Sequence, residues 1–157
     1  MKHCELVPGK GIRHGDTKIF FGARRKEMRK ALGEHKPPEG EINWEDEDEY
    51  EVDGNEWLRL RYLDDKLCDI EVLGGSLVFD GIELKATDIR TVKDKLNNLG
   101  LAISDESDWL SEGRDCVDLQ IVIATLTDIG EPGGPGDEMG DGIAWIFAST
   151  GFEIENA

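Results

Sequence analysis

The sequence is poor in the residues that most metal and catalytic sites use. Its three histidines, His3, His14 and His35, all lie in the first quarter of the chain, and none is at metal-ligand spacing from another. No motif marks a Ser, Cys or His nucleophile, and no GK[ST] loop marks a phosphate site. We therefore expect no metal, no cofactor and no catalytic residues.

Cysteines and long apolar runs are also scarce. Cys4, Cys68 and Cys116 are odd in number, widely spaced and free of any CxxC pattern, as in reduced cytosolic proteins. No apolar run approaches the about 18 residues that a membrane-spanning helix needs, and the N-terminus shows no signal-peptide core. These features predict a cytoplasmic protein that does not bind membranes.

Basic residues are unevenly distributed. Residues 1–40 hold ten Lys and Arg against five acids, whereas residues 101–157 hold thirteen acids and one base, Arg114. Residues 41–56 carry nine carboxylates and no base, within a total charge of −17. Such a field repels nucleic acid and attracts basic protein surfaces. A basic protein domain is therefore the expected partner.

The hydrophobic pattern predicts an α+β fold in a single domain, 1–157, because 157 residues suit about one domain. We expect an antiparallel sheet with two helices packed against it. The first helix is predicted at 23–32, with a solvated basic face, and the second begins after Thr87 or Asp88 and runs through Leu99. The predicted strands lie at 17–21, 77–84, 116–126 and 143–150, with a strand meander over 47–84.

The order of predicted elements suggests an internal duplication. Strand, helix, strand, strand occurs in residues 17–73 and again in residues 82–150. The corresponding halves would be 1–75 and 76–157. This β-α-β-β repeat rests on element order and not on residue identity.

The meander has a register that follows from its alternating residues. Three-residue turns at 53–55 and 64–66 would place an apolar face on one side and a row of opposite charges on the other. The predicted opposite pairs are Glu47–Arg61, Glu49–Arg59, Tyr50–Leu58, Leu58–Val72, Arg59–Glu71, Leu60–Ile70, Arg61–Asp69 and Tyr62–Cys68.

Two acidic segments are candidate binding surfaces. Trp44 lies among acids in 41–46 and would serve as an aromatic anchor, with packing in the core as the alternative. The loop 127–142 has six glycines and no lysine, and it is longer than a hairpin needs, so it is either a binding element or a solvated, disordered connection. Acids without a local base are best placed to meet a cationic partner. The predicted partner-binding residues are Trp44, Glu45, Asp46, Asp48, Asp137, Glu138 and Asp141.

The run GKGIRHGDTKIFFGARRKEMRKALGEHKPP (9–38) and the strands WLRLRYLDDKLCDIEVL (57–73) resemble a broad group of small bacterial proteins. These open with a glycine-bounded strand, FG, a charged helix and LG, followed by a meander ending in IEV. Many resemble immunity proteins that neutralise toxins delivered between competing bacteria. The pattern is also similar to the small-domain repeat of beta-lactamase inhibitor proteins and outer-membrane assembly lipoproteins. The chain differs in having Ala23 where Ser or Thr would cap the helix.

Together, the resemblance and the acidic charge predict a cytosolic immunity protein. It would bind a basic toxin domain, with a nuclease as the favoured target, and block its active site by occlusion. Two alternatives remain open from the sequence: a small enzyme that uses clustered carboxylates, and a generic protein-interaction adaptor.

Overall fold

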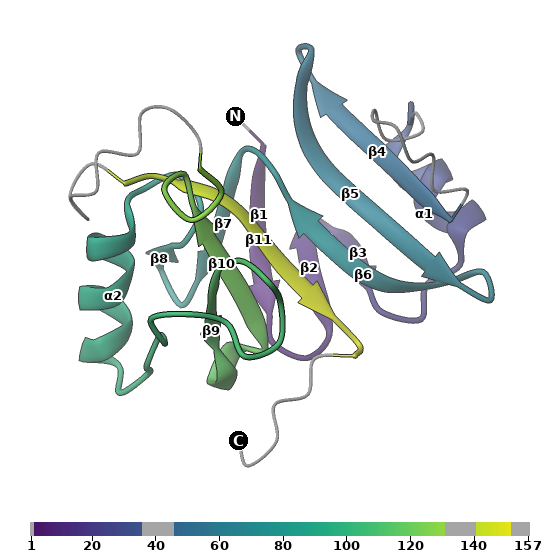
Figure 1. Cartoon of the computed structure of the whole chain (residues 1–157). Coiled ribbons are helices and arrows are strands. Elements are labelled where there is room, and N and C mark those ends of the chain that lie inside the picture. Colours follow the sequence, from purple (N-terminus) through teal and green to yellow (C-terminus); the bar gives the residue numbers. More distant parts are fainter. Residues whose placement is uncertain (1, 36–45, 131–140, 152–157) are drawn as a thin grey trace.

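The computed structural model describes residues 2–35, 46–130 and 141–151, which form two sheets and two helices (Figure 1). The first sheet has the strand order β3 (Thr17–Phe20), β2 (Gly11–His14), β1 (His3–Val7), β7 (Ser76–Phe79) and β8 (Ile82–Glu83). The second has the order β4 (Glu47–Val52), β5 (Asn55–Leu63), β6 (Lys66–Val72), β11 (Ile143–Ser149), β10 (Ile121–Thr125) and β9 (Arg114–Cys116).

The predicted α+β class with two helices is confirmed, but the single antiparallel sheet is wrong. Strand β1 lies between β2 and β7 and pairs in parallel with β7, so a separate first sheet forms. The predicted strand 116–126 is confirmed only in its second half, as β10. A 3-10 turn (Val117–Leu119) separates β9 from β10, and Gln120 follows it with a φ of 56°. A left-handed residue reverses the chain, which hydrophobic periodicity does not reveal.

The predicted meander register is confirmed at seven of its eight pairs. The turns are shorter than expected, because Val52 pairs with Asn55 and Leu63 with Lys66. In each hairpin the register shifts by one residue close to the two-residue turn. Beyond this shift the strands pair as predicted. The exception is Tyr62, which pairs with Leu67 and not with Cys68.

The apolar face of the meander forms part of the core. Leu58, Leu60, Tyr62, Ile70 and Val72 are all buried, as predicted. The first sheet packs on this face, and Gly11 of β2 marks the close approach. A Cβ at Gly11 would lie 3.2 Å from the Ile70 side chain and 2.3 Å from a backbone oxygen of β3.

The two helices attach differently. Helix α2 (Ile89–Asn98) buries Ile89, Val92 and Leu96, and the Asp88 side chain caps it by accepting a hydrogen bond from the Thr91 N–H at 2.8 Å. Helix α1 (Arg25–Leu32) buries Met28 and has no side-chain cap at its N-terminus. A short helix with little buried apolar surface needs another attachment to the sheet.

The element order repeats, as the sequence suggested, with two more strands in each unit than predicted. Strands β2 and β3, helix α1 and strands β4 to β6 are followed by β7 and β8, α2 and β9 to β11. An isolated bridge joins Arg24, before α1, to Lys66 at the start of β6. Its counterpart joins Asp88, before α2, to Gly142 at the start of β11. Each helix is thus tied to its own hairpin in the same way.

The two units meet at the pairing of β6 with β11, which lies in the middle of the second sheet (Figure 1). Glu71 is opposite Phe147, with the pairs Ile70–Ala148 and Val72–Ile146 on either side. The strand order is the same outward from this junction in both units, β6-β5-β4 on one side and β11-β10-β9 on the other. Residues at equivalent places can therefore be compared.

Replacing Leu60 with alanine should lower the free energy of unfolding by about 2–5 kcal/mol, because Leu60 is fully buried between the sheets. Arg61→Ala, on the opposite face of the same strand, should cost about 1 kcal/mol or less, because Arg61 is largely exposed. Urea unfolding measures both changes. Similar losses for the two variants would contradict the assigned faces.

Candidate interaction surface

The outer face of β4, β5 and β6 carries alternating rows of acids and arginines. Arg59 lies between Glu49 and Glu71, at 3.4 Å from each carboxylate. Arg61 contacts Asp69 at 3.3 Å and Asp46, at the end of the row, at 3.1 Å. The charged ladder consists of Asp46, Glu47, Glu49, Arg59, Arg61, Asp69 and Glu71.

Carboxylates outnumber guanidinium groups in the charged ladder by five to two. Burial raises the pKa of Glu47, and the neighbouring Asp46 and Asp69 add to that effect. Burial likewise raises the pKa of Glu71, with further contributions from Glu47 and other nearby acids. The pKa of each remains above its ordinary value even though Arg59 lowers it, because the effect of burial outweighs the attraction of that guanidinium group.

Exposure varies along the ladder. The side chains of Arg61 and Asp46 are 46% and 38% exposed, whereas Glu49 is 1% exposed. The Asp46 and Arg61 end of the ladder is therefore the more accessible one, whereas the Glu49 carboxylate is covered and contacts Arg59. The ladder combines accessible charges with a buried carboxylate that fixes one arginine in position.

An aromatic pair lies next to the ladder across β6 and β11. Phe147 is directly opposite Glu71, and the Trp109 ring lies against Phe147, with ring centroids 5.5 Å apart. Trp145, two residues from Phe147 on the same strand, belongs to the same face. All three rings are partly exposed. The outer face of the second sheet thus changes from charged to aromatic at its centre.

The segment that supplies Trp109 is tied down by a buried acid. The Asp115 carboxylate accepts hydrogen bonds from the Ser107 hydroxyl at 2.6 Å and from the Asp108 N–H at 2.8 Å. Asp115 is 3% exposed. Residues 101–113 also contain four acids and no base. The aromatic pair is therefore held in position within a further acidic region.

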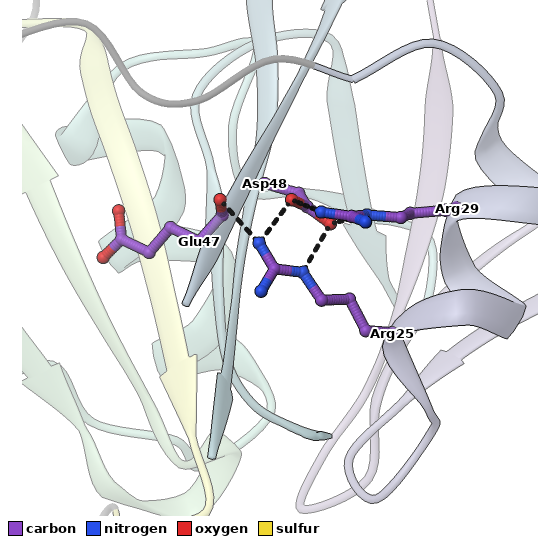
Figure 2. A network of polar contacts seen from close by, with 4 residues as sticks. All are labelled: Arg25, Arg29, Glu47 and Asp48. Carbon is purple, nitrogen blue, oxygen red and sulfur yellow. Dashed lines mark hydrogen bonds and ion pairs between the residues drawn. The ribbon is translucent and has the colours of Figure 1, made fainter. Parts of the chain in front are cut away.

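On the inner face of β4, a different interaction joins the sheet to α1. Figure 2 shows the Asp48 carboxylate bound by two arginines of that helix. Arg25 donates to it at 2.7 and 3.1 Å, and Arg29 at 2.8 and 2.9 Å. Burial would raise the pKa of Asp48, but the hydrogen bonds from Arg29 and Arg25 outweigh it and lower the pKa to about 2. This cluster supplies the attachment that the apolar side of α1 lacks.

Two expectations from the sequence are corrected here. Asp46 and Asp48 were expected to lack a local base, but Asp46 pairs with Arg61, and Asp48 is 2% exposed and held by two arginines. The basic face of α1 was expected to be fully solvated, yet Arg25 and Arg29 bind Asp48. Their spacing of four residues, which places both on one side of the helix, was the available signal.

The remaining candidate residues lie in or near the gaps between the described ranges. Trp44, Glu45, Asp137 and Glu138 fall outside the described residues, so their roles stay predictions. Asp141 is 3% exposed, and its carboxylate accepts a hydrogen bond from the Thr127 N–H at 3.0 Å. Asp141 therefore fixes one end of the glycine-rich loop and offers little to a partner.

The cysteines are mostly enclosed. Burial raises the pKa of the Cys4 and Cys116 thiols to about 11. Cys68 is partly exposed, and its thiol donates to the Arg61 carbonyl at 3.4 Å. Within the described ranges, no three His, Cys, Asp or Glu side chains are grouped so as to hold a metal, and no helix is long and apolar enough to cross a membrane.

Comparison with known proteins found no relative: no protein-family model, curated protein or solved structure matches the chain. Trp109 and Phe147 were not among the candidates from the sequence. The alternation of Trp145 and Phe147 in a strand was one available signal, but their position beside Glu71 depends on the pairing of β6 with β11.

Asp48→Asn should destabilise the protein at neutral pH and lose this effect in acid. The pKa of Asp48 falls from 3.8 to about 2 on folding, so its contribution is complete above about pH 4 and disappears as the pH falls toward 2. The shift corresponds to about 2 kcal/mol. Urea unfolding of both proteins between pH 2 and pH 7 measures the difference.

Asp94→Asn provides the control, because Asp94 is exposed on α2. Its stability should follow the wild type across the pH range. A difference between Asp48→Asn and wild type that stays constant down to pH 2 would contradict the assignment.

Proposed function

We propose that this protein binds a basic protein domain through the charged ladder and inhibits it, as an immunity protein inhibits a toxin. The observation that carries the proposal is the excess of carboxylates on the outer face of β4 to β6, where five acids share two arginines. The overall charge of −17 acts in the same direction, because it attracts cationic surfaces from a distance.

The construction of the ladder supports binding by a rigid surface. Arg59 and Arg61 each contact two carboxylates, so several charged side chains are ordered before a partner arrives. Ordering flexible side chains in advance reduces the entropy lost on association. Cationic side chains of a partner could then form ion pairs with the carboxylates without rearranging the side chains of the ladder.

The nature of the target follows from charge and shape. A domain that acts on nucleic acid presents a cationic cleft to phosphates, and a sheet face with surplus carboxylates is a chemical mimic of such a ligand. Occupying the cleft would exclude the substrate without any catalytic step. A toxin domain with nuclease activity is therefore the target that fits best, and the protein would act in the cytoplasm of the cell it protects.

The proposed contact with the partner also includes the glycine-rich loop and the segment before β4. Trp44, Glu45, Asp137 and Glu138 are proposed to extend the contact with the partner. Asp48 and Asp141 are assigned to the structure of the protein, because each is buried and hydrogen bonded.

Neutralising the ladder should slow binding to a cognate toxin. Glu47→Gln with Glu71→Gln removes two of its five carboxylates and keeps the side-chain size. We expect association at low ionic strength to slow by about 3- to 10-fold, with a weaker salt dependence, because surface charges act mainly on the association rate. Stopped-flow binding to a basic nuclease toxin domain that the wild-type protein inhibits measures this rate, and survival of cells producing both proteins measures inhibition.

The matched control is Asp94→Asn with Asp118→Asn, which removes the same charge from exposed positions away from the ladder. At an ionic strength of about 0.15 M this variant should bind within about twofold of the wild type, because charges more than about 8 Å from the contact are then largely screened. Equal slowing by both double variants would show that only net charge matters. Unchanged binding and protection by the ladder variant would refute the proposed surface.

A further inference from the structure

We propose that the aromatic pair Trp109 and Phe147 makes this surface selective for arginine over lysine in the partner. The inference rests on the proposed function and assigns the chemistry of the partner at the same surface. Its occupant is a protein segment that presents arginine side chains to the charged ladder.

The position of the pair beside the ladder is the first support. Phe147 pairs directly with Glu71, the innermost ladder acid, and both side chains lie on the outer face of the second sheet. Opposite side chains in an antiparallel pair have Cβ atoms about 4.5–5.5 Å apart. A cation that approaches Glu71 therefore lies within reach of the Phe147 ring.

The chemistry of the cation is the second support. A guanidinium group can donate two hydrogen bonds to a carboxylate while its flat face packs on an aromatic ring. An ammonium group is a compact, strongly hydrated charge and gains less from such a combined site. The surface supplies both features side by side, with Glu71 as the carboxylate and Phe147 and Trp109 as the rings.

A comparison of the two units gives a third support. In the first unit, Glu71 occupies the place that Phe147 occupies in the second, and Arg59 occupies the place of Val122. The charged and aromatic halves are thus equivalent parts of one sheet face with different chemistry. A partner that spans the junction of β6 and β11 would contact both.

The aromatic pair is also fixed before binding. Hydrogen bonds from the Ser107 hydroxyl and the Asp108 N–H to the buried Asp115 hold these two residues against β9. Trp109 follows immediately and lies against Phe147 at an interplanar angle of 30°. Both rings remain partly exposed in this arrangement.

Oligoarginine and oligolysine peptides of equal length test the inference by fluorescence anisotropy at low ionic strength. The wild type should bind oligoarginine about 2- to 5-fold more tightly for each guanidinium group that packs on the rings. Trp109→Leu and Phe147→Leu should each reduce this preference and leave oligolysine binding unchanged. Phe79→Leu, a partly buried aromatic position on β7 of the other sheet, is the control. Thermal unfolding shows whether each variant is folded.

The outcomes separate the inference from the proposed function. Loss of the arginine preference in either folded aromatic variant, with Phe79→Leu unchanged, supports the inference. Equal binding of both peptides by the wild type, or a preference that survives in Trp109→Leu and Phe147→Leu, overturns it. In that case, weaker binding of both peptides by Glu47→Gln with Glu71→Gln still supports the ladder. No effect of the ladder variant on either peptide overturns both proposals.

Discussion

The pairing of β6 with β11 is the interaction on which the rest of the structure depends. It joins two similar units into one six-stranded sheet, and it connects residues far apart in the sequence. Without it, neither the continuous core between the sheets nor the junction of charged and aromatic faces would exist. Long-range strand pairing of this kind is entropically demanding, so it must be supported by burial. Ile70, Val72 and Ile146 provide that burial at the junction.

Strand β4 shows how one acidic sequence serves two purposes. Successive side chains of a strand point to opposite faces, so EDEYE places Glu47 and Glu49 outward and Asp48 inward. A buried carboxylate is costly unless it is paired, and Arg25 and Arg29 supply the partners for Asp48. The outer acids receive fewer cations than they can bind. The same strand therefore attaches a helix on one side and presents surplus carboxylates on the other.

The sequence predicted local structure better than long-range arrangement. The register of the meander followed from charge and hydrophobicity, since a slip would bury Asp69 opposite Leu60. The two turns of the meander were predicted to have three residues, whereas each has two. A two-residue turn with a neighbouring bulge and a three-residue turn give the same strand pairs further along the hairpin, so the sequence pattern does not distinguish them. Nothing local indicated that β1 would pair with β7 or that Phe147 would lie beside Glu71. The partners of Asp48 were missed because they come from a helix more than fifteen residues away.

The glycine-rich loop occupies the place of a two-residue turn in the other unit. Asp64 and Asp65 close the hairpin of β5 and β6, whereas residues 127–142 connect β10 to β11. Asp128 and Asp141 secure the two ends of this longer connection through backbone N–H groups. With its ends fixed, the loop can gain or lose residues at an entropic cost that grows only slowly with length. This position therefore tolerates changes in length and sequence while the sheet stays the same.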